Sequence, residues 1–114
     1  MKMKLDEAVS MARTMAHSSN MRHHLGAVLY DQKRYTFGYN RCYDVEVVGY
    51  GNPFSVHAEE MAILKGVRIG IDFPNSTLVV VRVNSGGNLR MSKPCATCQK
   101  LIEKVGIKRI WYVG

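Results

Sequence analysis

Thr77-Leu78-Val79-Val80-Val81-Arg82-Val83 is the stretch of sequence that decides the fold. The run is rich in β-branched and apolar residues, and its apolar side chains fall on both faces of an extended strand. This pattern is typical of a strand that is covered on both sides, because a strand with one face in water alternates apolar and polar residues. We therefore expect this stretch to form the centre of a sheet with a helix layer on each face.

The residues after this strand predict one helix and one more strand. Pro94 precedes a predicted helix from Cys95 to Val105, and Gly106 is its expected stop. Proline is tolerated at the start of a helix, and glycine commonly follows its end. The predicted last strand covers Ile107 to Val113. Because crossovers between strands of one sheet are right-handed, the last two strands should be parallel.

The residues before the central strand complete the pattern. Apolar residues recur at helical spacing from Leu5 to Ala16, which predicts an amphipathic helix. Leu25 to Tyr30 and Tyr35 to Tyr39 flank a short polar segment and predict an antiparallel hairpin. We expect residues 40–56 to form a loop, and a second helix to run from about His57 to about Val67.

This order of elements predicts a single domain over residues 1–114. We expect a three-layer α/β/α sandwich built on a mixed sheet. With 114 residues, 46% of them hydrophobic, the chain has the composition of a globular protein rather than a disordered one. Apolar runs such as Leu78 to Val81 are far shorter than the roughly 20 residues that cross a bilayer, so we expect no membrane association.

Acidic residues soon after the basic start argue against a signal peptide. Asp6 and Glu7 follow Met1-Lys2-Met3-Lys4 and interrupt any apolar segment. We therefore expect a cytoplasmic protein, whose cysteines are free or bound to metal.

Positive charge is concentrated at the two ends of the chain. The net charge is +7, with about +4 over residues 1–41, −3 over 42–81 and +6 over 82–114. Such a distribution attracts anionic ligands, and free nucleotides and nucleic acids are equally compatible with it. Arg90 and Lys93 are candidates for binding a substrate phosphate, with solvent-exposed charge as the alternative.

Three side chains at two predicted helix starts form a candidate metal site. Cys95 and Cys98 are three residues apart, so both sulfurs leave the same face of the helix at its N-terminus. There the helix dipole favours thiolates, which are the form that a metal requires. His57 begins the preceding helix and completes a three-ligand set. Three protein ligands leave a fourth position open for water, which is typical of catalytic zinc.

Other interpretations of the cysteines remain. A four-ligand structural zinc site would also need Cys42, which lies in the predicted loop without a partner at zinc-finger spacing. A redox-active dithiol of the thioredoxin type would leave His57 and Glu59 without a role. Glu59 lies two residues after His57, so it points away from the ligand direction and is a candidate base rather than a ligand.

The spacing His57-Ala58-Glu59 followed by Pro94-Cys95-Ala96-Thr97-Cys98 resembles the cytidine and deoxycytidylate deaminase superfamily. Further segments that carry the resemblance are Leu25 to Leu29, Gly38 to Asn40, and Gly106 to Ile110. The resemblance implies a zinc-dependent hydrolase that acts on the amidine carbon of a nucleobase and releases ammonia. It implies that His57, Cys95 and Cys98 bind Zn²⁺ and that Glu59 shuttles protons.

The resemblance also implies the substrate contacts. Asn40 corresponds to a substrate-binding asparagine, and the backbone near Ala58 and Cys95 forms part of the pocket. Phe54, three residues before His57, is a candidate for stacking on a base, with loop packing as the alternative.

The chain departs from the family pattern in three places. The family continues with another helix and a fifth strand, whereas this sequence stops at Gly114, so we expect an open sheet edge that is covered in a homo-oligomer. Extra residues at 84–88 predict a hairpin or loop near the mouth of the site. Gln99 follows the second cysteine, where family members commonly carry a small residue, and nothing in the sequence explains it.

Three functions are compatible with these residues. The first is deamination of cytosine in a free nucleoside or nucleotide, because the small domain favours a small substrate. The second is deamination of a base within RNA or single-stranded DNA, as in a tRNA adenosine deaminase, which the basic C-terminal third favours. The third is a non-catalytic subunit of the same fold, against which the presence of Glu59 argues.

Overall fold

The computed structural model describes residues 3–43 and 54–114 as three α-helices, one short 3₁₀ helix and seven strands. In chain order, the helices and strands are α1 (Leu5–Ala16), β1 (His24–Tyr30), β2 (Tyr35–Tyr39), β3 (Arg41–Tyr43), β4 (Phe54–Val56), α2 (Ala58–Ile69), η1 (Phe73–Asn75), β5 (Thr77–Val83), β6 (Leu89–Arg90), α3 (Ala96–Val105) and β7 (Arg109–Tyr112).

Five of these strands form the main sheet, with β5 in its interior. On one side β5 pairs antiparallel with β1, which in turn pairs with β2. On its other side β5 pairs parallel with β7 from Thr77 to Val80 and antiparallel with β6 at Arg82 and Val83. The predicted mixed sheet, in which the last long strands are parallel, is therefore confirmed.

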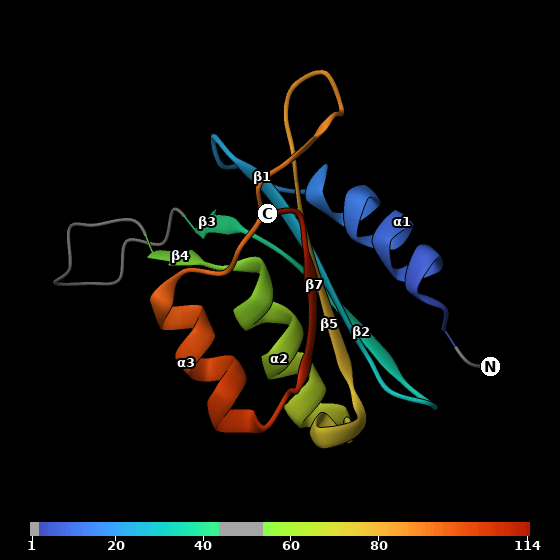
Figure 1. Cartoon of the computed structure of the whole chain (residues 1–114). Helices are drawn as coiled ribbons and strands as arrows, with labels where there is room; N and C mark the ends of the chain where they lie inside the picture. Colours follow the sequence, from blue (N-terminus) through green and yellow to red (C-terminus); the bar gives the residue numbers. More distant parts are fainter. Residues whose placement is uncertain (1–2, 44–53) are drawn as a thin grey trace, which may run out of the picture.

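Helices cover both faces of this sheet (Figure 1). Ala8 and Ala12 of α1 pack on one face against a cluster that includes Val79 and Val81. α2 and α3 cover the opposite face, where their side chains pack with Leu78 and Val80 in a second cluster. Alternate residues of β5 thus enter different cores, as the period of a strand requires. The predicted three-layer α/β/α sandwich is confirmed.

Two glycines allow helices to approach the sheet closely. A Cβ atom at Gly26 of β1 would lie 1.9 Å from the carbonyl oxygen of Ala12, in α1. A Cβ atom at Gly38 of β2 would lie 2.2 Å from the carbonyl oxygen of Ala58, in the first turn of α2. Since no real Cβ contact is this short, the backbone of each helix rests directly on a strand. Gly38 therefore determines how far the start of α2 stands from the sheet.

The prediction that residues 40–56 form only a loop is wrong at both ends. β3 and β4 pair antiparallel, with Arg41 opposite Val56, and form a separate two-stranded sheet. The side chain of Asn20 fixes β3, because it both donates to and accepts from the backbone of Cys42. The glycines, Asn52 and Pro53 of the predicted loop lie outside the described residues.

Other boundaries also differ from the sequence prediction, and the last strand covers Arg109–Tyr112 rather than Ile107 to Val113. α2 continues through Gly66 to Ile69 and ends at Gly70, whose φ of 78° is in the left-handed region. The predicted hairpin at 84–88 is present, and it leads into the short strand β6, which the sequence did not predict. This strand is the fourth along the path β2-β1-β5-β6, and β7, which pairs with β5, is the fifth strand of the main sheet.

Among the described residues, no helix combines the length and the apolar character that a membrane span needs.

Candidate metal centre and active site

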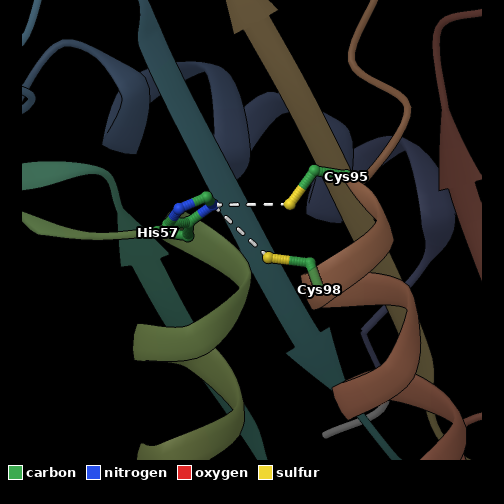
Figure 2. Close-up of side chains that lie close together, drawn as sticks. All are labelled: His57, Cys95 and Cys98. Carbon is green, nitrogen blue, oxygen red and sulfur yellow. Dashed lines mark hydrogen bonds between the residues drawn. The ribbon is translucent and has the colours of Figure 1, made fainter.

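The starts of α2 and α3 bring one imidazole and two thiols together. His57 is the residue immediately before α2, and Cys95 holds the same position before α3, with Cys98 in the first turn of α3. Figure 2 shows the three side chains pointing toward one another from the two helix tips. Nδ1 of His57 lies 3.9 Å from Sγ of Cys95 and 3.4 Å from Sγ of Cys98. All three ligand atoms lie within 4.8 Å of one another.

These distances fit a tetrahedral zinc ion. Zn–S bonds of about 2.3 Å and Zn–N bonds of about 2.1 Å separate nitrogen and sulfur ligands by about 3.6 Å in a tetrahedron. The two observed N···S distances lie on either side of this value. The donor set of two sulfurs and one nitrogen also suits zinc. The residues present therefore fit Zn²⁺ with one coordination position left for a further ligand.

Side-chain hydrogen bonds hold the backbone on which the ligands sit. Oε1 of Glu60 accepts the backbone N–H of His57 at 3.1 Å. Nε2 of Gln99 donates to the carbonyl oxygen of Pro94 at 2.8 Å, which fixes the turn just before Cys95. The structure thus gives Gln99 a role that the sequence did not explain. A small side chain at this position would lack the amide that reaches Pro94.

Ser92 ties the segment before Cys95 to the sheet and to the end of the chain. Its buried hydroxyl donates to the carbonyl oxygen of Val80 at 2.8 Å and accepts the N–H of Val113 at 2.9 Å. The N–H of Ser92 in turn donates to the carbonyl oxygen of Val113. The approach to α3 is therefore anchored on β5.

Glu59 is a buried carboxyl group beside the three ligands. Only 3% of its surface is exposed, and within the described residues Oε1 has no hydrogen-bond partner. Burial raises the pKa of Glu59, although hydrogen bonds and the nearby His57 oppose this rise. Burial also raises the pKa of Cys98, and the negative charge of Glu59 raises it further. A cation between them would offset both effects, since it favours the charged forms.

A cavity of about 300 Å³ opens at these residues. Its lining includes His57, Ala58, Glu59, Cys95 and Asn40, so it brings together five of the seven predicted site residues. This volume is at the lower end of the range for small-molecule sites. Cys98 is not among the lining residues of this cavity, and its side chain is almost fully buried.

Asn40 lines the cavity and also fixes the loop between α1 and β1. Its Oδ1 accepts the N–H of Leu25 at 2.9 Å, and its Nδ2 donates to the carbonyl oxygen of His23. Each amide atom keeps one further hydrogen-bonding position. The structure therefore gives this residue a backbone-holding role that the sequence did not predict.

The other residues that the sequence suggests for the site do not all line the same cavity. Lys93 lines the active-site cavity, whereas Arg90 lines a neighbouring one. Phe54 begins β4, but its side chain lies outside the described part of the structure. Cys42 does not belong to the metal-binding cluster found among the described residues.

The sequence marks two further lining residues weakly or not at all. Arg22 and His23 lie in the loop before β1 and line the cavity. From the sequence, His23 is a possible contact for phosphate or metal, with a basic surface cluster as the alternative, and Arg22 is not singled out. Loop residues carry no periodicity that would indicate which way they face.

Solved structures that are similar to this chain include a dCMP deaminase and two cytidine deaminases. The dCMP deaminase from the cyanophage S-TIM5 in apo form is 23% identical, with a TM-score of 0.67, over 95% of this chain and 82% of that chain. The cytidine deaminase from Burkholderia pseudomallei is 18% identical, with a TM-score of 0.67, over 91% of this chain and 78% of that chain. At these identities the likeness establishes the fold.

The cytidine deaminase from Mycobacterium tuberculosis is 20% identical, with a TM-score of 0.63, over 96% of this chain and 83% of that chain. No curated protein sequence matches the chain.

A family model covers nearly the whole sequence. Residues 2–114 match the model described as the cytidine and deoxycytidylate deaminase zinc-binding region. The description names a zinc-binding region, and the cluster of His57, Cys95 and Cys98 offers a donor set that suits zinc, so the predicted Zn²⁺ cofactor is confirmed. The chain belongs to the cytidine and deoxycytidylate deaminase family.

Proposed function

We propose that the chain, as one domain over residues 1–114, is a zinc-dependent hydrolytic deaminase that acts on cytosine in a free nucleoside or nucleotide. The observation that carries this proposal is the buried carboxyl group of Glu59, with a free oxygen, beside a three-donor cluster in a cavity of about 300 Å³. A carboxyl oxygen that is buried without a hydrogen-bond partner costs stability, so the position of Oε1 indicates a chemical role.

In this proposal the ligands are Nδ1 of His57 and the thiolates of Cys95 and Cys98. Zn²⁺ in such a site acts as a Lewis acid and makes water a competent nucleophile at neutral pH. Glu60 and Gln99 hold the backbone of the ligands in place through their hydrogen bonds to His57 and Pro94.

Glu59 is the proposed proton shuttle. Its desolvated carboxylate accepts one proton from the attacking water and passes it to the ring nitrogen. It then accepts the second proton from the hydroxyl group added to the ring carbon and passes it to the departing amine. The water oxygen bonds to the carbon that carries the exocyclic amine, and the C–N bond to that amine breaks. Cytosine and water thus give uracil and ammonia, and Glu59 ends in its starting state.

Asn40, Ala58 and Phe54 are the proposed substrate contacts. Asn40 presents its remaining amide hydrogen and oxygen lone pair to the cavity. Ala58 lies in the first turn of α2, where backbone N–H groups lack partners within the helix. Phe54 precedes two cavity-lining residues of β4, Ser55 and Val56, and is proposed to stack on the base.

A nucleotide substrate is supported by one of the similar structures. The cyanophage S-TIM5 dCMP deaminase was crystallised in complex with dCMP and dUMP. A base within RNA or single-stranded DNA is the second candidate, and it is favoured by Arg22, His23 and Lys93 in the cavity lining. The buried carboxyl group of Glu59 argues against a non-catalytic subunit, which would have no use for it.

The test measures ammonia release by the zinc-loaded protein. Substrates are cytidine, deoxycytidine, their monophosphates, adenosine, a single-stranded oligonucleotide and a tRNA anticodon stem. Glu59→Gln should lower the rate on the preferred substrate at least about 10²-fold and retain zinc, since Glu59 is not a ligand. Glu103→Gln, on the exposed side of α3, is the matched control. Unchanged turnover in Glu59→Gln would contradict the assigned role.

We also propose that the protein forms a homo-oligomer through β7. Within the described residues, β7 pairs only with β5, and Ile110 and Tyr112 are each 38% exposed. An exposed apolar edge strand is normally covered, and a second copy is the simplest cover. Light scattering should therefore give a mass above that of one chain, and Ile110→Lys should reduce it. A cytoplasmic location is proposed because all three cysteines are free.

A further inference from the structure

A second cavity, of about 510 Å³, opens beside the active-site cavity at the start of β1 and the end of β5. Arg22 and His23 line both cavities, so the two cavities are neighbours that share a wall in the loop before β1. The second cavity adds Arg82, Arg90 and His24 to this lining. No Asp or Glu side chain is among its lining residues. We call this feature the basic cavity.

Two of its arginines face each other across paired strands. Arg82 of β5 and Arg90 of β6 are direct partners in the antiparallel register. Like charges at directly opposite positions destabilise a sheet, unless a counter-charge lies between them. Since no carboxylate lines the cavity, the protein itself supplies no such counter-charge there. The pair is therefore suited to an external anion.

Arg82 also lies on the face of the sheet that carries the metal centre. Leu78 and Val80 of β5 pack with α2 and α3, and the period of two places Arg82 on this same face. Arg82 is opposite Leu25 of β1, which lines the active-site cavity. A ligand that extends from the active-site cavity along this face reaches Arg82 and its partner Arg90.

A hydrogen bond from Arg82 determines which ring nitrogen of His23 can donate to a ligand in the cavities. Nη2 of Arg82 lies 2.8 Å from Nδ1 of His23. A guanidinium group can only donate, so Nδ1 is the acceptor and Nε2 carries the ring hydrogen. His23 then offers one N–H donor, and the arginines offer several in a planar fork that matches phosphate oxygens.

We propose that the basic cavity is a phosphate-binding subsite for the substrate, distinct from the cavity that holds the base. This inference rests on the proposed deaminase function and narrows it to phosphorylated substrates. The phosphate belongs either to a free nucleotide or to a nucleic acid strand, and both present the same anionic oxygens to Arg82 and Arg90. The cationic lining favours phosphate over a stacked base, since it contains no Phe, Tyr or Trp ring.

The experiment compares kcat/KM for cytidine, cytidine monophosphate and a single-stranded oligonucleotide with one cytosine. Arg90→Gln removes one exposed guanidinium group from the basic cavity. Arg68→Gln removes the same group from the exposed last turn of α2 and is the matched control. The binding of a fluorescein-labelled oligonucleotide, with cytidine monophosphate as competitor, is measured by anisotropy at two salt concentrations.

The wild type should prefer a phosphorylated substrate over cytidine. Arg90→Gln should reduce this preference about tenfold, as expected for the loss of one charge-assisted hydrogen bond, and Arg68→Gln should leave it unchanged. If the preference is for cytidine monophosphate, the phosphate comes from a free nucleotide; if it is for the oligonucleotide, with a steeper salt dependence, it comes from a strand.

Equal kcat/KM for cytidine and both phosphorylated substrates would overturn the inference and leave the deaminase function intact. Equal effects of Arg90→Gln and Arg68→Gln would also overturn it. If no substrate releases ammonia, the proposed function fails, and the anisotropy measurement still decides whether Arg90 binds phosphate.

Discussion

Gly38→Ala should weaken zinc binding, although residue 38 contacts no metal ligand. The added Cβ would lie 2.2 Å from the carbonyl oxygen of Ala58, and real Cβ contacts are essentially never below 3.0 Å. The first turn of α2 must therefore move by about 1 Å, a shift that follows from the packing of backbone on backbone. His57 precedes this turn directly, so its distances of 3.4 and 3.9 Å to the two sulfurs change with it.

The expected size of the effect follows from this shift. Metal–ligand distances tolerate only about 0.2 Å, and disturbing the support of a ligand typically costs 10- to 100-fold in metal affinity. Overpacking of this kind also costs about 1–3 kcal/mol of stability. We therefore expect a zinc dissociation constant raised at least about tenfold and a lower melting temperature. Competition with a chromophoric chelator measures the first, and thermal unfolding of the metal-free protein measures the second.

Gly26→Ala is the matched control for this prediction. Its Cβ would lie 1.9 Å from the carbonyl oxygen of Ala12, so the clash is at least as severe but displaces α1, on the opposite face of the sheet. The control should lose stability and keep its zinc affinity when measured on folded protein. The reasoning is refuted if Gly38→Ala binds zinc as tightly as the wild type, or if the two variants lose equal affinity.

Three further predictions concern metal and stability. Zinc should raise the melting temperature of the wild type and not of Cys98→Ala, which lacks a ligand. Ser92→Ala should cost about 1–3 kcal/mol in denaturant unfolding, because the buried C=O of Val80 and the partly buried N–H of Val113 lose their partner. Asp31→Asn should destabilise the protein at neutral pH by a similar amount, and the difference from the wild type should shrink as the pH falls below about 4 in pH-dependent unfolding.

The sign of the Asp31 prediction follows from its surroundings. Burial opposes the charged form, but the N–H groups of Asp72, Lys33 and Arg34 donate to the carboxylate and together lower its pKa below the ordinary value of an aspartate. A depressed pKa stabilises the folded state above the unfolded-state pKa, and this stabilisation is lost as the pH falls through the folded-state pKa. A difference between Asp31→Asn and the wild type that stayed constant from pH 7 to pH 2 would contradict this account.

Elements with strong local signals could be predicted from the sequence. The periodic helix Leu5–Ala16 and the β-branched strand Thr77–Val83 have the predicted boundaries, because their burial patterns run their full length. β3 and β6 were missed because strands of two or three residues have no measurable period. Their pairing depends on contacts with residues far along the chain, such as Asn20 with Cys42.

The metal-binding cluster could be predicted because its ligands are residue types with known metal chemistry at short, characteristic sequence spacings. Two cysteines three residues apart and a histidine at another helix start leave few alternatives. The rest of the cavity lining could be predicted only in part, because Arg22 and His23 enter it from a loop whose path depends on Asn40. Likewise, the function of Gln99 became visible only when its contact with Pro94 was known.

The ligand spacing also bears on which metals the protein admits. His57 and the two cysteines already stand at near-tetrahedral separations, on helix tips that their neighbours hold in place. Magnesium and calcium ions prefer six or more oxygen ligands, so they should bind only weakly to three nitrogen and sulfur ligands that lie this close together. The types of the ligand atoms and the distances between them are thus sufficient for the protein to select against abundant hard cations, and no conformational change is needed.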